Sequence, residues 1–209
     1  MKNQMLIGLT GGIGSGKSVV SRFWSTYTGI KLIDIDQLCR ELVEVEQPGW
    51  VTLKENLGAS FFKSDGSLDR VALRLAIFEN DALRERVNQL IHPLALDLFH
   101  REVAETDQSV LVEVPLLFEA GWESEFQCSV VVYADPHCCC NRVSSRDDIS
   151  PDKAAKAIVA QMGMWEKAML ADHVIDNRYG WFRTRMQVVH LAKLLGTDGC
   201  SYLLQDEAI

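Results

Sequence analysis

The chain has 209 residues, of which 47% are hydrophobic, enough for one domain or for one domain with an insertion. Acidic residues outnumber basic ones, 29 to 21, and the formal net charge of −8 argues against general binding to nucleic acids or to membrane surfaces. The sequence shows neither a signal-peptide pattern nor an apolar stretch of the roughly 20 residues that span a membrane, so we expect a cytoplasmic protein.

A phosphate-binding loop follows the first predicted strand. Residues 5–10 form a short apolar run typical of a buried strand, and residues 11–18 fit the pattern G-x-x-x-x-G-K-[ST]. The chain can continue from Ser18 as a helix, which completes the context that the motif requires. Loop N–H groups and the helix start favour an anion, Lys17 adds a cation, and the Ser18 hydroxyl suits Mg²⁺. We favour this interpretation over an ordinary glycine turn.

Two aspartates accompany the second predicted strand, which begins at residue 30. If the strand continues to residue 36, Asp34 and Asp36 face the same side. Asp36 could cap a helix over residues 37–43, or it could be a general base or metal ligand at a strand end. Beside a phosphate loop we favour the functional interpretation, with Asp34 serving the metal or raising the proton affinity of its neighbour.

The next clear strand starts only at residue 109, and this interval is too long for one crossover helix. Most of it reads as helix: residues 70–78 after a cap at Ser67 or Asp69, and residues up to 91 after a cap at Asn80 or Asp81. We expect Pro93 to interrupt the helix at His92 and to begin another over residues 93–105. His92 would then lie at the joint of a helical insertion, where a structural role is by itself commoner than a ligand contact.

An acidic residue lies near the end of the strand at residues 109–114. Glu113 is a candidate for the acid that faces the magnesium shell in phosphate-loop enzymes, and a water-exposed edge position is the alternative. Residues 115–119 leave the strand through a proline. The apolar side chains at 116–118 suit either core packing or an apolar ligand surface.

A helical hairpin is predicted after residue 135. Its first helix carries Arg142 and Arg146 on one face, and Ser150-Pro151-Asp152 is a strong start for the second. The arginine face could close over transferred phosphates, although salt bridges to neighbouring aspartates are the commoner role. The other elements expected in this half are a strand at 128–133, a short strand at 173–175, a closing helix at 181–195 that stops at Gly196, and a poorly ordered last dozen residues.

Three of the six cysteines are consecutive, Cys138 to Cys140, and no two cysteines form a C-x-x-C pair. Adjacent helix residues point about 100° apart, so three in a row cannot converge on one tetrahedral metal ion. We therefore expect reduced, partly buried thiols.

Taken in order, these segments resemble the dephospho-CoA kinase family over nearly the whole chain. The resemblance rests on Gly8 to Ser18, Ile33 to Asp36 with Arg40, Leu90 to Leu94, Val114 to Glu119, Arg142 with Arg146-Asp147, Gln161, and Ala171 to Asn177. The first segment alone fits many kinases, whereas the ordered set is highly specific. The resemblance implies an α/β fold with a P-loop nucleoside-monophosphate-kinase-like core of five parallel strands and helices on both faces. It implies a core at residues 1–36 and 109–209, a helical lid at about 137–162, and a largely helical substrate domain at 37–108.

The resemblance also implies the reaction: ATP, with Mg²⁺, phosphorylates the ribose 3′-hydroxyl of dephospho-CoA in the final step of coenzyme A biosynthesis. The implied catalytic residues are Asp36 as base, Lys17, Arg142 and Arg146. The implied ATP-binding residues are Gly12, Ile13, Gly14, Ser15, Gly16, Lys17, Ser18, Val19, Arg142 and Asn177. The implied substrate-binding residues are Asp36, Arg40, His92, Pro115, Leu116, Leu117 and Glu119. Ser18 would bind the metal, with Asp34 or Glu113 acting through water. We expect a monomer or weak homo-oligomer without nucleic-acid or membrane partners.

The sequence departs from the family pattern at a few positions. Val19 stands where a threonine is common, so a hydroxyl near the phosphates is lost while Ser18 remains. The cysteine run has no counterpart, and Gly163-Met164-Trp165 replaces a usually more polar segment after Gln161.

Two rival functions remain open at this point. A kinase for shikimate or a nucleoside monophosphate would share the loop, and a panel of acceptors would distinguish it. A nucleotide-dependent switch would belong to another class, but the D-x-x-G and N-K-x-D motifs of a GTP switch do not occur in this sequence.

Overall fold

The computed structural model describes residues 4–197 and divides this part of the chain into two compact units. The first unit contains the chain up to Asp34 and again from Thr106 onward, and the second contains Ile35–Glu105. The second unit therefore interrupts the first in sequence.

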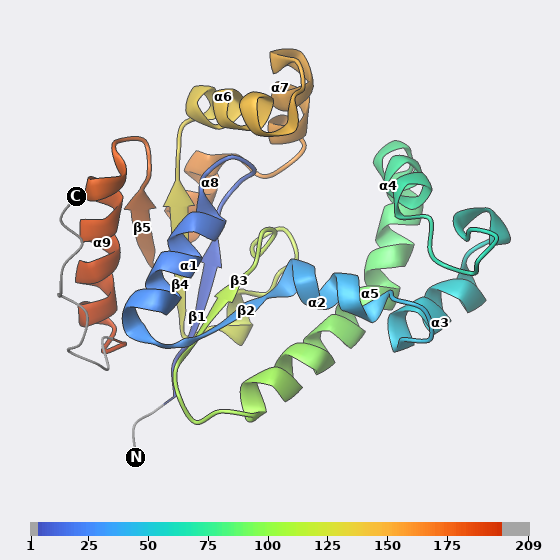
Figure 1. Ribbon diagram of the computed structural model, residues 1–209, viewed down its shortest axis with the longest axis horizontal. Helices are drawn as coiled ribbons and strands as arrows, with labels where there is room; N and C mark the ends of the chain where they lie inside the picture. Colours follow the sequence, from blue (N-terminus) through green and yellow to red (C-terminus); the bar gives the residue numbers. More distant parts are fainter. Residues whose placement is uncertain (1–3, 198–209) are drawn as a thin grey trace. The chain divides into compact units, whose positions relative to one another are not determined.

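Within residues 4–197, the first unit is built on a sheet of five parallel strands (Figure 1). The strands are β1 (Leu6–Thr10), β2 (Lys31–Asp34), β3 (Val110–Glu113), β4 (Cys128–Tyr133) and β5 (His173–Asp176), in the order β2-β3-β1-β4-β5. Because the strands are parallel, their carboxyl ends meet at one edge, and the loop after β1 leaves from the middle of that edge. The predicted α/β fold with five parallel strands is confirmed.

Helices surround the sheet of the first unit. They are α1 (Lys17–Thr28), α6 (Pro136–Asp147), α7 (Pro151–Val159), α8 (Met164–Leu170) and α9 (Trp181–Leu194), with a 3-10 turn at Glu123–Glu125. α1 packs beside α9, and α6 and α7 form a hairpin beyond the carboxyl ends of the strands (Figure 1). The Ser150 hydroxyl accepts from the Lys153 N–H at 3.4 Å, so the predicted cap of α7 is confirmed.

The core of the first unit lies between the sheet and the helices α1 and α9. Ile7, Leu111 and Val130 are fully buried, and so is Trp24 of α1. The Trp24 Nε1 donates to the Thr197 hydroxyl at 3.3 Å, which satisfies its polar group. Full burial of each such side chain contributes about 1.5–3 kcal/mol, and this packing holds the strand ends that carry the loop.

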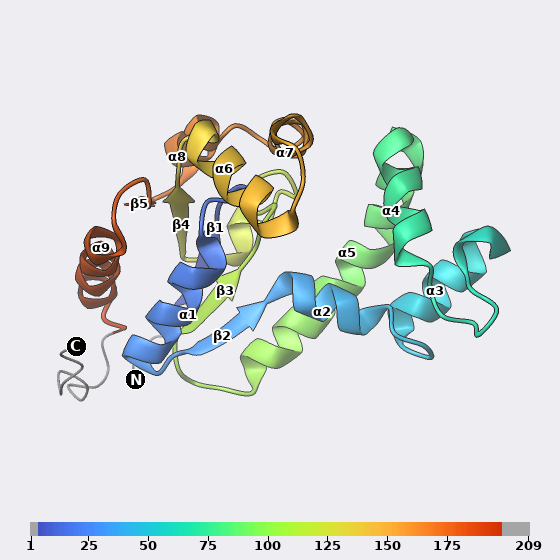
Figure 2. The same ribbon diagram turned by 45° about the horizontal axis from the view of Figure 1, so that its top comes forward.

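The second unit is helical, with α2 (Ile35–Leu42), α3 (Pro48–Asn56), a 3-10 turn (Ala59–Phe61), α4 (Arg70–Glu79) and α5 (Asp81–Ala104). The long helix α5 contacts α2, α3 and α4 (Figure 2). The small core of the second unit contains Leu53, Leu73, Val87 and Ile91. The predicted caps are confirmed where Asp69 accepts from the Ala72 N–H at 3.0 Å and Asn80 from the Leu83 N–H at 3.0 Å.

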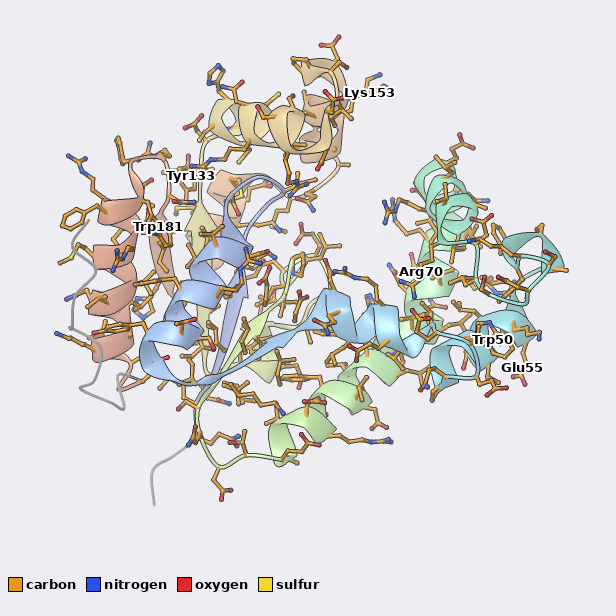
Figure 3. All side chains as sticks on the ribbon, viewed as in Figure 1. Trp50, Glu55, Arg70, Tyr133, Lys153 and Trp181 are labelled. Atoms are coloured by element: carbon orange, nitrogen blue, oxygen red, sulfur yellow. The ribbon has the colours of Figure 1, made fainter. Side chains whose placement is uncertain are left out.

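Arg70 and Trp50, both labelled in Figure 3, make polar contacts between elements of this unit. The Arg70 guanidinium donates to the backbone oxygen of Arg40 at 2.8 Å and to the Glu44 carboxylate at 2.6 Å. The Trp50 Nε1 donates to the backbone oxygen of Gly66 at 2.9 Å. The Arg70 bond to Arg40 holds α2 beside the start of α4, and the Trp50 bond holds α3 beside the loop before α4.

The condition for placing Asp34 and Asp36 on one side of a strand is not met. β2 ends at Asp34, and α2 begins at Ile35, with Asp36 in the first turn of the helix rather than at its cap. Strand alternation therefore does not relate Asp34 to Asp36. The physical reason is that β3 ends opposite Asp34, at Glu113, so no ladder partner in β3 remains for a longer strand.

The expected break at Pro93 is also wrong, because α5 continues through it as one helix. Val87, Ile91, Ala95 and Phe99 are buried at a spacing of four residues on both sides of the proline. Pro93 itself is exposed, so its ring lies on the opposite face and its missing N–H removes one helical bond there. Continuous burial of this face outweighs the local preference of the proline.

Two helices were not anticipated, α3 and α8. α9 and the left-handed Gly196 (φ 64°) that follows it agree with the predicted closing helix and its stop. The predicted disorder of the last dozen residues falls outside the described residues. None of the helices in residues 4–197 has the length and apolar composition needed to cross a membrane.

Candidate active site

The loop after β1 has the backbone geometry of an anion cradle. Gly14 (φ 79°) and Gly16 (φ 91°) lie in the left-handed region that favours glycine, and Lys17 begins α1 directly after them. A Cβ on Gly16 would lie 2.2 Å from Nδ2 of Asn177, and a Cβ on Gly14 would lie 2.6 Å from the backbone oxygen of Cys139. Both positions therefore require glycine for the chain direction and for the close approach of neighbouring segments.

A buried carboxylate holds the two polar side chains that end the loop. The Lys17 Nζ donates to Glu113 Oε1 at 2.5 Å, and the Ser18 hydroxyl donates to the same oxygen at 2.6 Å. The other oxygen, Oε2, accepts from the Ser21 hydroxyl at 2.6 Å. Glu113 is only 4% exposed, so the alternative of a water-exposed edge position is wrong.

Glu113 remains ionised in this environment. Burial alone would raise the pKa of its carboxyl, but the Lys17 charge and the three hydrogen bonds outweigh burial and hold the pKa below its ordinary value. An ionised Glu113 balances the Lys17 ammonium and fixes its direction. Ser21 was not predicted for this site, and its position one helical turn after Ser18 is the only sequence signal that could have identified it.

The side of the loop nearest β5, which we call the β5 flank (Arg142, Asn177 and Thr184), holds backbone oxygens. Arg142 donates from Nη1 to the oxygens of Gly14 at 3.3 Å and Ser15 at 3.2 Å, and from Nη2 to that of Asn177 at 2.8 Å. The Asn177 Nδ2 donates to the Ser15 oxygen at 2.7 Å, and its Oδ1 accepts from the Thr184 hydroxyl at 2.9 Å. These bonds turn loop carbonyls outward, which favours an inward direction for loop N–H groups.

A second group of side chains, which we call the β3 flank because it is joined to the segment after β3 (Glu119, Gln161, Met164 and Lys167), includes two acceptors for the loop. The Ile13 N–H donates to Gln161 Oε1 at 2.9 Å, and the Gly12 N–H donates to Met164 Sδ at 3.0 Å. Among these acceptors, Gln161 carried a sequence signal through its family motif, whereas Met164 did not. Neither was among the predicted site residues.

A buried lysine anchors the loop that follows β3. The Lys167 side chain is fully buried, and its Nζ donates to Glu119 at 2.8 Å and to the backbone oxygen of Pro115 at 3.0 Å. Leu117 is fully buried, whereas Leu116 is 44% exposed. Among the predicted substrate residues of this loop, Leu116 therefore presents an apolar side chain to solvent, and Leu117 belongs to the core.

The two arginines of α6 have different partners although they lie one turn apart. Arg142 contacts the loop, whereas Arg146 forms a bidentate pair with Asp147 at 2.7 and 2.8 Å. The Asp147 hydrogen bonds raise the pKa of Arg146, so its charge is kept. Its guanidinium is largely exposed and the pair is correspondingly weak.

Three predicted substrate residues belong to the second unit. Asp36 and Arg40 are exposed on α2, where the Arg40 Nε donates to the backbone oxygen of Asp36 at 3.1 Å. His92 lies within α5 and is partly buried, and burial lowers the pKa of its imidazole. His92 is therefore placed in a continuous helix and not at a joint.

Oxygen donors suited to Mg²⁺ stand where β2 and β3 end. The Ser18 hydroxyl contacts the Glu113 carboxylate, and Asp34 is the register partner of Glu113 on the neighbouring strand. Such oxygens are the ligands that Mg²⁺ prefers, so the residues fit this ion. Across residues 4–197 no cluster of three or more His, Cys, Asp or Glu side chains could hold a metal, which is compatible with an ion that keeps water and phosphate ligands.

The cysteine run lies in the first half of α6. Cys139 is buried, and burial raises the pKa of its thiol to about 11. The cysteines within residues 4–197 form no disulfide, and Cys200 lies outside this part of the chain.

Comparisons with known proteins agree with this geometry. A family model described as Dephospho-CoA kinase matches residues 5–181. The Dephospho-CoA kinase of Bacillus cereus is 35% identical over 193 residues, covering 90% of this chain and 96% of that protein. The solved structure of TT1252 from Thermus thermophilus covers 93% of this chain and 98% of its own, with a TM-score of 0.81 and 27% identity. Dephospho-CoA kinase from Campylobacter jejuni shares the fold, with a TM-score of 0.66 and 20% identity over 91% of this chain and 96% of its own.

Proposed function

Because this chain belongs to the dephospho-CoA kinase family, we propose that it moves the γ-phosphoryl group of ATP onto the ribose 3′-hydroxyl of dephospho-CoA. Its family and curated relatives make it an ATP-dependent kinase of coenzyme A biosynthesis. One observation carries the residue-level proposal. Lys17 begins α1 directly after the glycine loop and contacts Glu113 at the end of β3, and β2 ends beside Glu113, two residues before Asp36 in the chain.

The loop would bind the donor nucleotide. The amides before α1 and the positive end of that helix attract the phosphates, and Lys17 would exchange part of its contact with Glu113 for the outer phosphates. Ser18 would hold Mg²⁺, with Asp34 or Glu113 acting through water. When bound, the ion neutralises charge on the β- and γ-phosphates.

Asp36 is proposed as the base on the acceptor side. The 3′-oxygen attacks the γ-phosphorus, the bond from that phosphorus to the bridging oxygen of ADP breaks, and the hydroxyl proton passes to the Asp36 carboxylate. Asp36 is exposed in the first turn of α2, directly after the end of β2. Arg40, His92 and the loop from Pro115 to Glu119 are proposed to bind the rest of the substrate, with Leu116 as its apolar contact.

The arginines of α6 would stabilise the charge of the moving phosphoryl group. Arg142 is already on the loop, and its contacts with the Gly14 and Ser15 oxygens would place it beside the phosphates. Arg146 would leave the exposed pair with Asp147, whose small stability makes this exchange inexpensive in free energy. Closure of the α6–α7 hairpin would also keep water from acting as the acceptor.

The net charge of −8 supports the proposal that the enzyme acts without nucleic acid. A cytoplasmic location and a monomeric or weakly homo-oligomeric state remain predictions from the sequence.

The test is to incubate the protein with Mg-ATP and dephospho-CoA and to identify coenzyme A by mass, beside shikimate and a nucleoside monophosphate as rival acceptors. Asp36→Asn should bind ATP normally and lose about 10²–10⁴ in turnover. The exposed Asp107→Asn is the matched control and should retain turnover. Phosphorylation of a rival acceptor alone would overturn the substrate, and near-normal turnover of Asp36→Asn would overturn the base.

A further inference from the structure

Two N–H groups near the start of the loop donate hydrogen bonds to side chains just before and at the start of α8. Gln161 Oε1 accepts from the Ile13 N–H at 2.9 Å, and Met164 Sδ accepts from the Gly12 N–H at 3.0 Å. A Cβ on Gly12 would lie 2.9 Å from that sulfur, so this close approach depends on glycine at position 12. The residues that follow the α6–α7 hairpin are thereby hydrogen-bonded directly to the phosphate-binding loop.

The Ile13 contact fixes which way the Gln161 amide points. A backbone N–H can only donate, so the side-chain atom that faces it must be the oxygen. The NH₂ group then lies at the other end of the amide plane. Within the described part of the chain, the Gln161 Nε2 has no hydrogen-bond partner, and the side chain is partly exposed. The bond from the Ile13 N–H to Oε1 therefore also holds the NH₂ group of Gln161, with its two donor hydrogens, near the start of the loop.

Gln161 also lies next to the segment that follows β3. The next residue, Met162, donates its N–H to Glu119 Oε1 at 3.1 Å, and Glu119 follows β3. In the sheet, β3 separates β1 from β2, and the proposed base Asp36 follows β2. The β5 flank lies on the opposite side of β1. Gln161 is therefore joined to the segment that follows β3, the strand between β1 and β2.

We propose that Gln161 is a ligand of the terminal phosphate of ATP. Its Oε1 stays on the Ile13 N–H, and its Nε2 donates a hydrogen bond to an oxygen of the γ-phosphoryl group. A neutral donor on a fixed amide distinguishes ATP from ADP, because ADP has no phosphate at this position. The assignment rests on the proposed function for the direction of transfer, and it adds a residue that contacts the reacting group.

The deciding variant is Gln161→Glu. Glutamate has the same shape and retains an oxygen for the Ile13 N–H, but it replaces the NH₂ donor by an anionic oxygen. Affinity for a non-hydrolysable ATP analogue should fall by about 10–100-fold, because a bond to a charged group is lost and repulsion is added. Affinity for ADP should change by less than about twofold. Gln161→Ala removes both bonds without adding charge, and should weaken the ATP analogue by about 2–10-fold with ADP again little changed.

Met164→Leu is the matched control. It removes the neighbouring acceptor on Gly12 while retaining an apolar side chain of similar volume. It should change the affinities for the ATP analogue and for ADP by the same small factor. Binding is measured by calorimetry with Mg²⁺ present, and circular dichroism checks that each variant is folded.

Equal losses for ATP analogue and ADP in both Gln161 variants, or no loss in either, would overturn the proposal. Because these are binding measurements, their outcome is separate from the identity of the acceptor. If the unmodified protein forms no coenzyme A, the proposed function fails, whatever the ratio of the two nucleotide affinities.

Discussion

The two flanks of the phosphate loop hold it by opposite kinds of bond. On the β5 flank, Arg142 and Asn177 donate to loop carbonyl oxygens. On the β3 flank, Gln161 and Met164 accept from loop N–H groups. Bonds to the carbonyls shape the loop without competing with a phosphate, whereas bonds to the N–H groups occupy donors of the kind that a phosphate uses. The β5 flank therefore maintains the cradle, whereas the β3 flank holds two loop donors, and in our proposal the Ile13 N–H keeps its bond to Gln161 when the nucleotide binds.

The largest effect on activity is expected from replacing Lys17, the positively charged side chain of the loop. Lys17→Ala should lower kcat/KM by about 10³ or more, because the cation for the outer phosphates is lost from a largely buried site. Steady-state kinetics with varied ATP measure this. The exposed lysine of α9 gives the control Lys193→Ala, which should be unchanged. An active Lys17→Ala enzyme would contradict the assignment of the loop.

A large effect on stability is expected from the ion pair on the β3 flank, and it should be unequal for the two partners. Glu119→Gln leaves a fully buried ammonium without its counter-charge, and should lower the free energy of unfolding by about 3–5 kcal/mol. Lys167→Met should cost less, because the remaining carboxylate of Glu119 is 22% exposed and can be hydrated. Urea unfolding of both variants gives the order, and a reversed order would contradict the burial argument.

Replacing each of the two arginines of α6 should change the kinetic constants in a different way. Arg142→Ala should raise the KM for ATP as well as lower kcat, by about 10²-fold in kcat/KM, because Arg142 holds the loop itself. Arg146→Ala should lower kcat with little change in KM, because its guanidinium reaches the phosphoryl group only in the proposed closed state. Identical profiles for the two variants would remove the distinction between them.

The smallest effect is a pH dependence that comes from Glu113. Its pKa in the folded protein lies below its ordinary value of 4.5, so the unfolded chain takes up the proton first as pH falls. The stabilisation is therefore present above that value and is lost as pH falls through the lower, folded pKa. Glu113→Gln should flatten the acid side of the stability curve measured by urea unfolding between neutral and acidic pH. An unchanged curve would show that Glu113 is not the group responsible.

The failures of sequence-based prediction in this protein share a cause. Pro93 predicts a helix end by its local chemistry, but buried Val87, Ile91, Ala95 and Phe99 continue the same face through it. Alternation would have placed Asp36 beside Asp34 only in a longer strand, but β2 ends opposite the last residue of β3. In both cases, contacts with a neighbouring element outweighed the preference of the residue itself.

Local rules were sufficient where one segment contains all the interacting groups. The loop motif, the caps at Asp69, Asn80 and Ser150, and β4 could be predicted because the glycines, cap side chains or apolar run lie next to the backbone that they affect. The parallel sheet itself followed from the family resemblance.

By itself, the sequence determined the family, the phosphate loop and the strands that carry it. Only the tertiary structure decided that Glu113 is buried on Lys17, that Arg142 holds the loop while Arg146 does not, and that Gln161 meets the Ile13 N–H. These pairs are separated by about 90 to 150 positions in the chain. Such contacts form only where strands and helices bring distant segments together, and no spacing or propensity within one segment records them.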